Sequence, residues 1–137
     1  EFLAPCVSLL TPNLPEAAKL LGRDPSELAA PDKIESAAVE LVKRFRTAVL
    51  LKGGHRSDGS FDDYFLPPEG DGVWLSTRVA PPCGNHGTGC LLSSSIACGL
   101  ASGLSMPESI RRAKERLSDA LERGLSLGHG NSPVDFR

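Results

Sequence analysis

The sequence has no long apolar run, no basic block and no closely spaced cysteine pair. Nothing in it approaches the roughly 20 apolar residues of a membrane-spanning helix, and no charged segment followed by an apolar one marks a secretory signal. Fifteen Lys and Arg stand against seventeen Asp and Glu, for a net charge of −2, which argues against nucleic acid as a partner. We therefore expect a cytoplasmic protein that binds neither membranes nor nucleic acids.

The four cysteines, Cys6, Cys83, Cys90 and Cys98, form no C-x-x-C pair. Such pairs are typical of zinc sites and thiol-redox proteins, so the sequence supports neither. We predict reduced thiols that are mostly buried, as free cysteines of cytosolic proteins usually are. Cys90 is an exception because it stands at a predicted helix start.

The pattern of apolar residues predicts an α/β layered fold with a mainly parallel sheet. The chain of 137 residues, 40% hydrophobic and 23% charged, suits one domain, and we find no internal repeat. Apolar runs at 6–10 and 47–52 are typical of buried strands and alternate with helical periodicity at 14–21 and 34–45. Such alternation favours strands joined by helices.

The remaining elements are predicted by turn residues. Asn13 and Asp32 are the expected N-caps of the first two helices. The segment 57–79 is rich in Gly and Pro and predicts a small antiparallel excursion. An apolar helix over 90–101 and a second that starts near Ser105 follow.

The segment Asn85-His86-Gly87-Thr88-Gly89-Cys90 is the strongest functional signal. Its glycines permit close approach of the backbone to a ligand, and unpaired N–H groups at the following helix start attract anions. We predict a phosphate site at Gly87, Thr88 and Gly89. A tight turn that binds nothing has the same spacing, and that alternative stays open.

Cys90 is the candidate catalytic base. At the first turn of a helix a thiolate is favoured electrostatically, and it could accept a proton from a hydroxyl that attacks phosphorus. The alternative is a small buried apolar residue.

Two further candidates follow the ends of predicted strands. Asn13 and Glu16 could hold Mg²⁺, directly or through water, or could merely cap a helix. Lys52, before Gly53-Gly54, could neutralise phosphate charge or could be a solvated residue in a turn. In open α/β sheets ligands bind at this edge, so phosphoryl transfer explains all these signals together.

Four segments resemble hydroxymethylpyrimidine phosphate kinases of the ribokinase-like group: Thr11–Ala17, Val49–His55, His86–Cys90 and Gly128–Gly130. The resemblance covers only the C-terminal half of such a kinase, and it implies an α/β/α sandwich of which residues 1–137 form the nucleotide-binding half. It also implies ATP and Mg²⁺ as cofactors and a pyrimidine alcohol, hydroxymethylpyrimidine or its monophosphate, as the substrate.

The resemblance assigns roles residue by residue. Glu16, in an N-x-x-E motif that starts at Asn13, would act on Mg²⁺ and phosphate. Gly87–Gly89 would form the anion hole, and Lys52 would lie near the phosphates. Cys90 stands where most ribokinase-like enzymes have an Asp base, and this favours the pyrimidine kinases.

Two alternatives remain open, a pyridoxal kinase of the same group and a nucleotide-binding fragment without turnover. The expected partners are the N-terminal half of the domain and further copies of the chain in a homo-oligomer.

Overall fold

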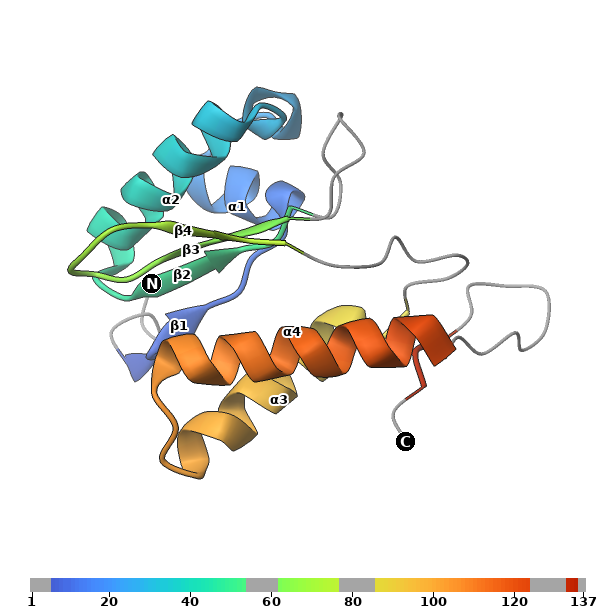
Figure 1. The fold of residues 1–137 in the computed structure, drawn as a ribbon. Helices are drawn as coiled ribbons and strands as arrows, with labels where there is room; N and C mark the ends of the chain where they lie inside the picture. Colours follow the sequence, from blue (N-terminus) through green and yellow to red (C-terminus); the bar gives the residue numbers. More distant parts are fainter. Residues whose placement is uncertain (1–5, 54–61, 77–85, 124–132, 136–137) are drawn as a thin grey trace. The chain divides into compact units, whose positions relative to one another are not determined.

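The computed structural model describes residues 6–53, 62–76, 86–123 and 133–135. The chain divides into two compact units, Glu1–Ser76 and Thr77–Arg137. The first unit holds a sheet with its helices, and the second holds a pair of α-helices (Figure 1). Among the described residues, no helix is both long and apolar enough to cross a membrane.

The first unit is a four-stranded sheet with two α-helices and one short 3₁₀ helix. In chain order these are β1 (Leu9–Leu10), α1 (Leu14–Leu21), η2 (Pro25–Leu28), α2 (Pro31–Phe45), β2 (Ala48–Leu51), β3 (Asp63–Leu66) and β4 (Val73–Leu75). The strand order is β1-β2-β3-β4, with β1–β2 parallel and the other two pairings antiparallel.

This topology confirms the α/β class and the antiparallel excursion. Within the described ranges, however, the sheet is mixed rather than mainly parallel. The reason is that β3 and β4 form a hairpin beside β2, whereas only β1 and β2 are joined by the helical crossover that parallel strands require.

Helix α1 begins and ends where the sequence predicts. Asn13 Oδ1 accepts a hydrogen bond from Glu16 N at 2.8 Å, and Glu16 Oε2 accepts one from Asn13 N at 2.8 Å. These reciprocal bonds are a capping box, which satisfies two backbone donors at the helix start. The helix ends at Gly22, whose φ of +71° suits glycine.

The prediction that Asp32 caps α2 is wrong by two residues. Ala30 is the N-cap and makes no side-chain bond, Pro31 is the first helical residue, and Asp32 lies in the first turn. Pro31 explains the shift, because its fixed φ suits the first helical position, where the N–H that proline lacks would have no partner within the helix.

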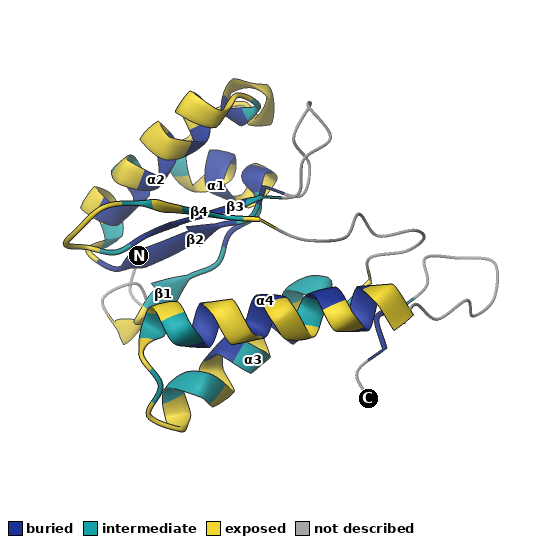
Figure 2. Ribbon diagram, viewed as in Figure 1, coloured by how far each residue is buried: buried dark blue, intermediate teal, exposed yellow. Residues whose placement is uncertain are grey.

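The core of the first unit lies between the sheet and its helices. Figure 1 shows α1 and α2 on one side of the sheet, and Figure 2 shows their buried residues facing it. All four residues of β2 are buried, as predicted. The buried members of the core are Leu14, Ala17, Ala18, Leu28, Ile34, Ala37, Ala38, Leu41, Val42, Val49, Leu51, Tyr64 and Leu66.

The strand predicted over 6–10 is shorter and more exposed than expected. Only Leu9 and Leu10 are extended in β1, both are half-buried, and Val7 is 37% exposed. Among the strands that the structure describes, β1 stands at one end of the order and pairs only with β2.

The second unit contains α3 (Thr88–Ala101) and α4 (Met106–Arg123), which pack against each other. Glycine allows their close approach, since a Cβ on Gly99 would lie 2.8 Å from Ser109 Oγ. Val134 adds to a small cluster with Leu91, Ala120 and Leu121, and its N–H donates to His86 O at 3.1 Å. The predicted loop at 128–131 lies outside the described residues.

Candidate functional site

Asn13 and Lys52 are neighbours in space although they are far apart in the sequence. They form a parallel bridge that extends the pairing of β1 with β2, and Lys52 N donates to Pro12 O at 2.8 Å. Lys52 directly follows β2 and Asn13 lies three residues after β1, so both lie at the carboxyl ends of these parallel strands, which is the edge where open α/β sheets bind ligands. The fold therefore brings two of the predicted phosphate and metal segments together.

Glu16 lies one turn into α1 at the same edge. Its side chain is exposed, and one carboxylate oxygen is held by the Asn13 N–H. The Asn13 amide oxygen is in turn held by the Glu16 N–H. In this arrangement Glu16 is the acidic group that remains accessible, while the Asn13 oxygen serves as the cap.

The Glu16 carboxylate at this edge fits a Mg²⁺ ion that also binds a phosphate. Among the described residues, no three His, Cys, Asp or Glu side chains cluster closely enough to hold a metal. Mg²⁺ typically keeps several waters and binds through one or two carboxylates together with substrate phosphates. The exposed Glu16 carboxylate, on the helix capped by the residue that pairs with Lys52, is compatible with that mode and not with an all-protein cage.

The turn after β2 is held by a residue that the sequence reasoning missed. Gly53 N donates to Asp63 Oδ1 at 3.0 Å, and this hydrogen bond is buried. Asp63 is the first residue of β3 and is only 7% exposed. The sequence did contain a signal for this role, because Asp63 is an acidic residue in an otherwise apolar strand and Asp is normally depleted in strands.

The helix that follows the predicted anion site starts at Thr88, two residues before the predicted start at Cys90. Gly87 is the N-cap of α3, with a φ of +91°, a conformation that glycine adopts without strain. Thr88, Gly89 and Cys90 are therefore the first three residues of the helix. Their N–H groups lie in the first turn of the helix, and Gly87 makes no side-chain hydrogen bond to that turn.

The expectation of buried thiols is wrong for Cys6 and Cys98, whereas Cys90 was expected to be an exception. Cys6, Cys90 and Cys98 are all exposed. α3 has small residues around much of its circumference, and it packs mainly through Leu91, Leu92 and Ile96, so its cysteines fall outside the contact face. Cys90 thus has the accessibility that a base requires, while Cys83 lies outside the described residues.

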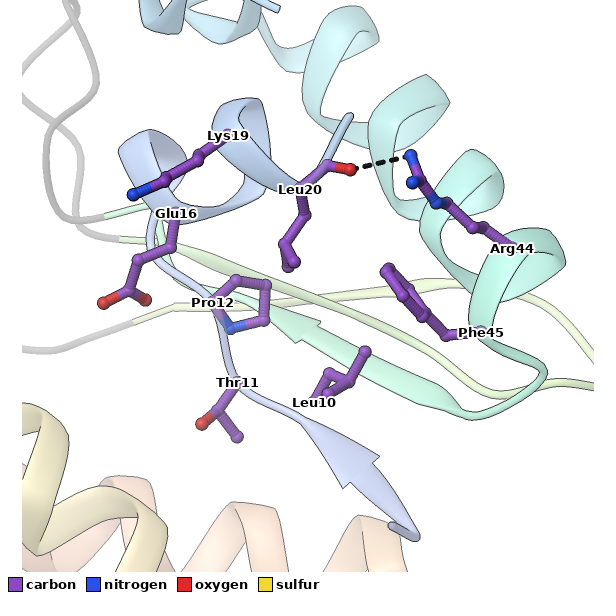
Figure 3. Close-up of a pocket in the computed structure, with 8 residues that line it drawn as sticks. All are labelled: Leu10, Thr11, Pro12, Glu16, Lys19, Leu20, Arg44 and Phe45. Carbon is purple, nitrogen blue, oxygen red and sulfur yellow. Dashed lines mark hydrogen bonds between the residues drawn. The ribbon is translucent and has the colours of Figure 1, made fainter. Parts of the chain in front are cut away.

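A hollow of about 620 Å³ lies beside β1 in the first unit. Figure 3 shows its apolar floor and a charged margin at Lys19 and Arg44. Arg44 Nη1 donates to Leu20 O at 2.8 Å and its guanidinium lies 5.6 Å from the centre of the Phe45 ring. The lining residues are Leu10, Thr11, Pro12, Glu16, Lys19, Leu20, Arg44 and Phe45. Glu16 is the one predicted site residue in this lining.

The chain is similar to characterised proteins over nearly its whole length. It is 39% identical over 133 residues to the hydroxymethylpyrimidine/phosphomethylpyrimidine kinase of Streptomyces coelicolor, covering 97% of this chain and 48% of the relative. It is 36% identical over 135 residues to the thiamine biosynthesis bifunctional protein ThiED of Geobacter sulfurreducens, covering 98% of this chain and 27% of the relative. The chain thus spans about half the length of the curated single-function kinases that it matches.

A solved structure confirms the ribokinase-like fold. Pyridoxal kinase from Staphylococcus aureus in complex with AMP-PCP and pyridoxal superposes with a TM-score of 0.88 at 27% identity, covering 98% of this chain and 49% of that chain. The family model for phosphomethylpyrimidine kinase matches residues 1–135. With the motif geometry, this match shows that the chain belongs to the phosphomethylpyrimidine kinase family.

Proposed function

We propose that this chain is the nucleotide-binding half of an ATP-dependent kinase that phosphorylates hydroxymethylpyrimidine or its monophosphate in thiamine biosynthesis. The observation that carries the proposal is the bridge between Asn13 and Lys52. It joins the start of the N-x-x-E helix to a cation at the ligand edge of the sheet, in a chain whose family consists of kinases.

Each predicted residue has a proposed role in phosphoryl transfer. Lys52 neutralises phosphate charge, and the N–H groups of Gly87, Thr88 and Gly89 stabilise the charge that develops on the transferred group. Glu16 holds Mg²⁺, directly or through a water molecule, and the ion supplies charge neutralisation at the phosphates.

Cys90 is the proposed general base. Its thiolate accepts the proton of the substrate hydroxyl as that oxygen bonds to the γ-phosphorus of ATP, and the bond from phosphorus to the bridging oxygen breaks to release ADP. The support is its exposure and its place as the third residue of α3, beside the proposed anion hole.

Pyridoxal is the second candidate substrate, because the similar structures include pyridoxal kinases. Nucleotide use has support in both cases, since those kinases were solved with ADP or AMP-PCP. The curated relatives favour the pyrimidine, as they carry its name at higher identity to this chain.

We also propose that the remaining half of the kinase domain, which the relatives carry, completes the substrate site. The supporting observations are that β1 pairs only with β2 among the described strands, and that an apolar hollow lies next to it. A homo-oligomer, a cytoplasmic location and the absence of nucleic acid as a partner stay predictions.

The decisive experiment is a phosphorylation assay of the full-length gene product. Purified protein with ATP and Mg²⁺ is given hydroxymethylpyrimidine, its monophosphate or pyridoxal at matched concentrations, and kcat/KM is measured for each. We expect the pyrimidines to be preferred. Preference for pyridoxal would select the second candidate, and nucleotide binding without turnover of any of the three would leave a binding module.

A further inference from the structure

We propose that Asp63 is a positioning residue, which places Lys52 at the phosphate-binding edge by holding the turn in which β2 ends. The inference rests on the proposed role of Lys52. The observation that supports the inference is the buried hydrogen bond of 3.0 Å from Gly53 N to Asp63 Oδ1.

The turn is held from two sides. On one side Lys52 N donates to Pro12 O at 2.8 Å, which ties the turn to the N-x-x-E segment. On the other side Asp63 receives the N–H of the next residue, Gly53. The N–H of Lys52 thus points toward the β1 side of the sheet, and the N–H of Gly53 points toward β3. Together these two hydrogen bonds fix the orientation of the backbone at Lys52.

Asp63 is itself held in place by the sheet. The register of β2 with β3 sets Leu51 opposite Tyr64, so the preceding residue of β3, Asp63, comes level with the place where β2 gives way to the turn. On its other edge Asp63 pairs with Leu75 of β4. The carboxylate therefore reaches the turn from a strand with neighbours on both sides.

An acidic residue at this position is unfavourable for the strand alone. Asp63 is 7% exposed, burial of a carboxylate is costly unless it is hydrogen-bonded, and Asp is depleted in strands. An apolar residue would satisfy the sheet. What an apolar residue cannot do is accept the Gly53 N–H, and hydrogen bonds to a carboxylate are stronger than those between neutral groups.

The consequence for catalysis is geometric. Phosphoryl transfer depends on positioned charge, and a displacement of about 1 Å can reduce the rate by about 100-fold. Without the acceptor at Asp63 the turn loses the hydrogen bond that holds Gly53, so Lys52 would sample positions away from the phosphates.

The test is a double-mutant cycle in the full-length protein, with ATP KM, kcat and thermal stability measured for each variant. Asp63→Leu places an apolar residue of similar size in the strand and removes the acceptor. Asp63→Asn keeps an acceptor oxygen, and Lys52→Met removes the cation. We expect Asp63→Leu to lower kcat/KM for ATP by about 10- to 100-fold. Asp63→Asn should restore most of it, and Asp63→Leu should cause little further loss when Lys52 is already Met.

A matched control separates positioning from stability. Phe65→Leu, on the same strand, should lower the melting temperature without changing kcat/KM for ATP. Equal loss from Asp63→Leu in the presence and absence of Lys52 would overturn the inference and leave Asp63 a residue of the fold alone. If Lys52→Met were itself neutral, the proposed role of Lys52 would be wrong, and the positioning role would end with it.

Discussion

At the scale of single residues, Glu16 combines a structural and a proposed chemical role that one substitution separates. Its carboxylate accepts the Asn13 N–H at 2.8 Å, and Gln can take the same place in a capping box. Glu16→Gln therefore keeps the helix start and removes the charge that would attract Mg²⁺.

We predict that Glu16→Gln in the full-length enzyme raises the Mg²⁺ concentration for half-maximal activity by about 10-fold or more. The melting temperature should change little. A titration of activity against Mg²⁺ checks this. An unchanged titration would reduce Glu16 to a residue that complements the helix dipole, with a contribution of about 0.3–1 kcal/mol to stability.

Cys90 and Cys98 offer a matched pair, because both are exposed and both lie on α3. We predict that Cys90→Ala lowers kcat by about 10²- to 10⁴-fold, the usual contribution of a general base, with little change in ATP binding. Cys98→Ala should leave both unchanged. Near-normal turnover of Cys90→Ala would exclude the thiol as the base.

At the scale of elements, α4 carries a charge cluster that makes its stability depend on pH. Glu108 Oε1 lies 2.7 Å from Arg111 Nη2 and 2.7 Å from Arg112 Nε. These hydrogen bonds, from Arg111 first and then Arg112, lower the pKa of Glu108 from 4.5 to about 2. Because the folded pKa lies below the unfolded one, the stabilisation is present above about pH 4.5 and is lost as the pH falls toward 2.

We predict that Glu108→Gln lowers the melting temperature slightly at neutral pH, since exposed ion pairs contribute little. The difference from the parent protein should vanish as the pH falls from 4.5 to about 2. Thermal unfolding followed by circular dichroism measures this. Glu122→Gln removes an exposed acid from the same helix and is the control for the loss of one negative charge. A difference that persists at pH 2 would refute the assignment.

At the scale of the whole molecule, the chain matches only about half the length of its single-function relatives. We predict that these 137 residues alone do not phosphorylate hydroxymethylpyrimidine at a measurable rate. Positioning of both substrates supplies up to about 7–11 kcal/mol of the barrier reduction, and a half that holds phosphates without the acceptor alcohol lacks that contribution. Turnover before and after addition of the separately expressed other half checks this.

The hollow beside β1 supplies a paired control for that experiment. Leu20 lines it and is 37% exposed, whereas Val39 on α2 is 39% exposed and lies outside its lining. Leu20→Asp should prevent the other half from restoring activity, and Val39→Asp should not. Robust turnover by the chain alone would show that the other half is dispensable.

The local signals in the sequence were sufficient for most elements. The start of α1 at Asn13 and its end at Gly22 were predictable, because a capping side chain and a left-handed glycine act within one turn of the helix. The continuous apolar run of β2 predicted burial on both faces. Asp32 failed as a cap because the fixed φ of Pro31 began the helix earlier.

The arrangement of the site depended on tertiary structure. No periodicity reveals that Lys52 N meets Pro12 O, because a parallel pairing joins segments separated by a whole crossover. The same holds for Asp63, whose role depends on the strand register that brings it to Gly53. Exposure of Cys90 and Cys98 likewise followed from which face of α3 packs, and a helix of small residues carries little periodic signal for that face. Residue types and motif spacing therefore determined which groups could act on phosphate. Sheet pairing decided that the Asn13 and Lys52 segments lie side by side and that Asp63 reaches Gly53.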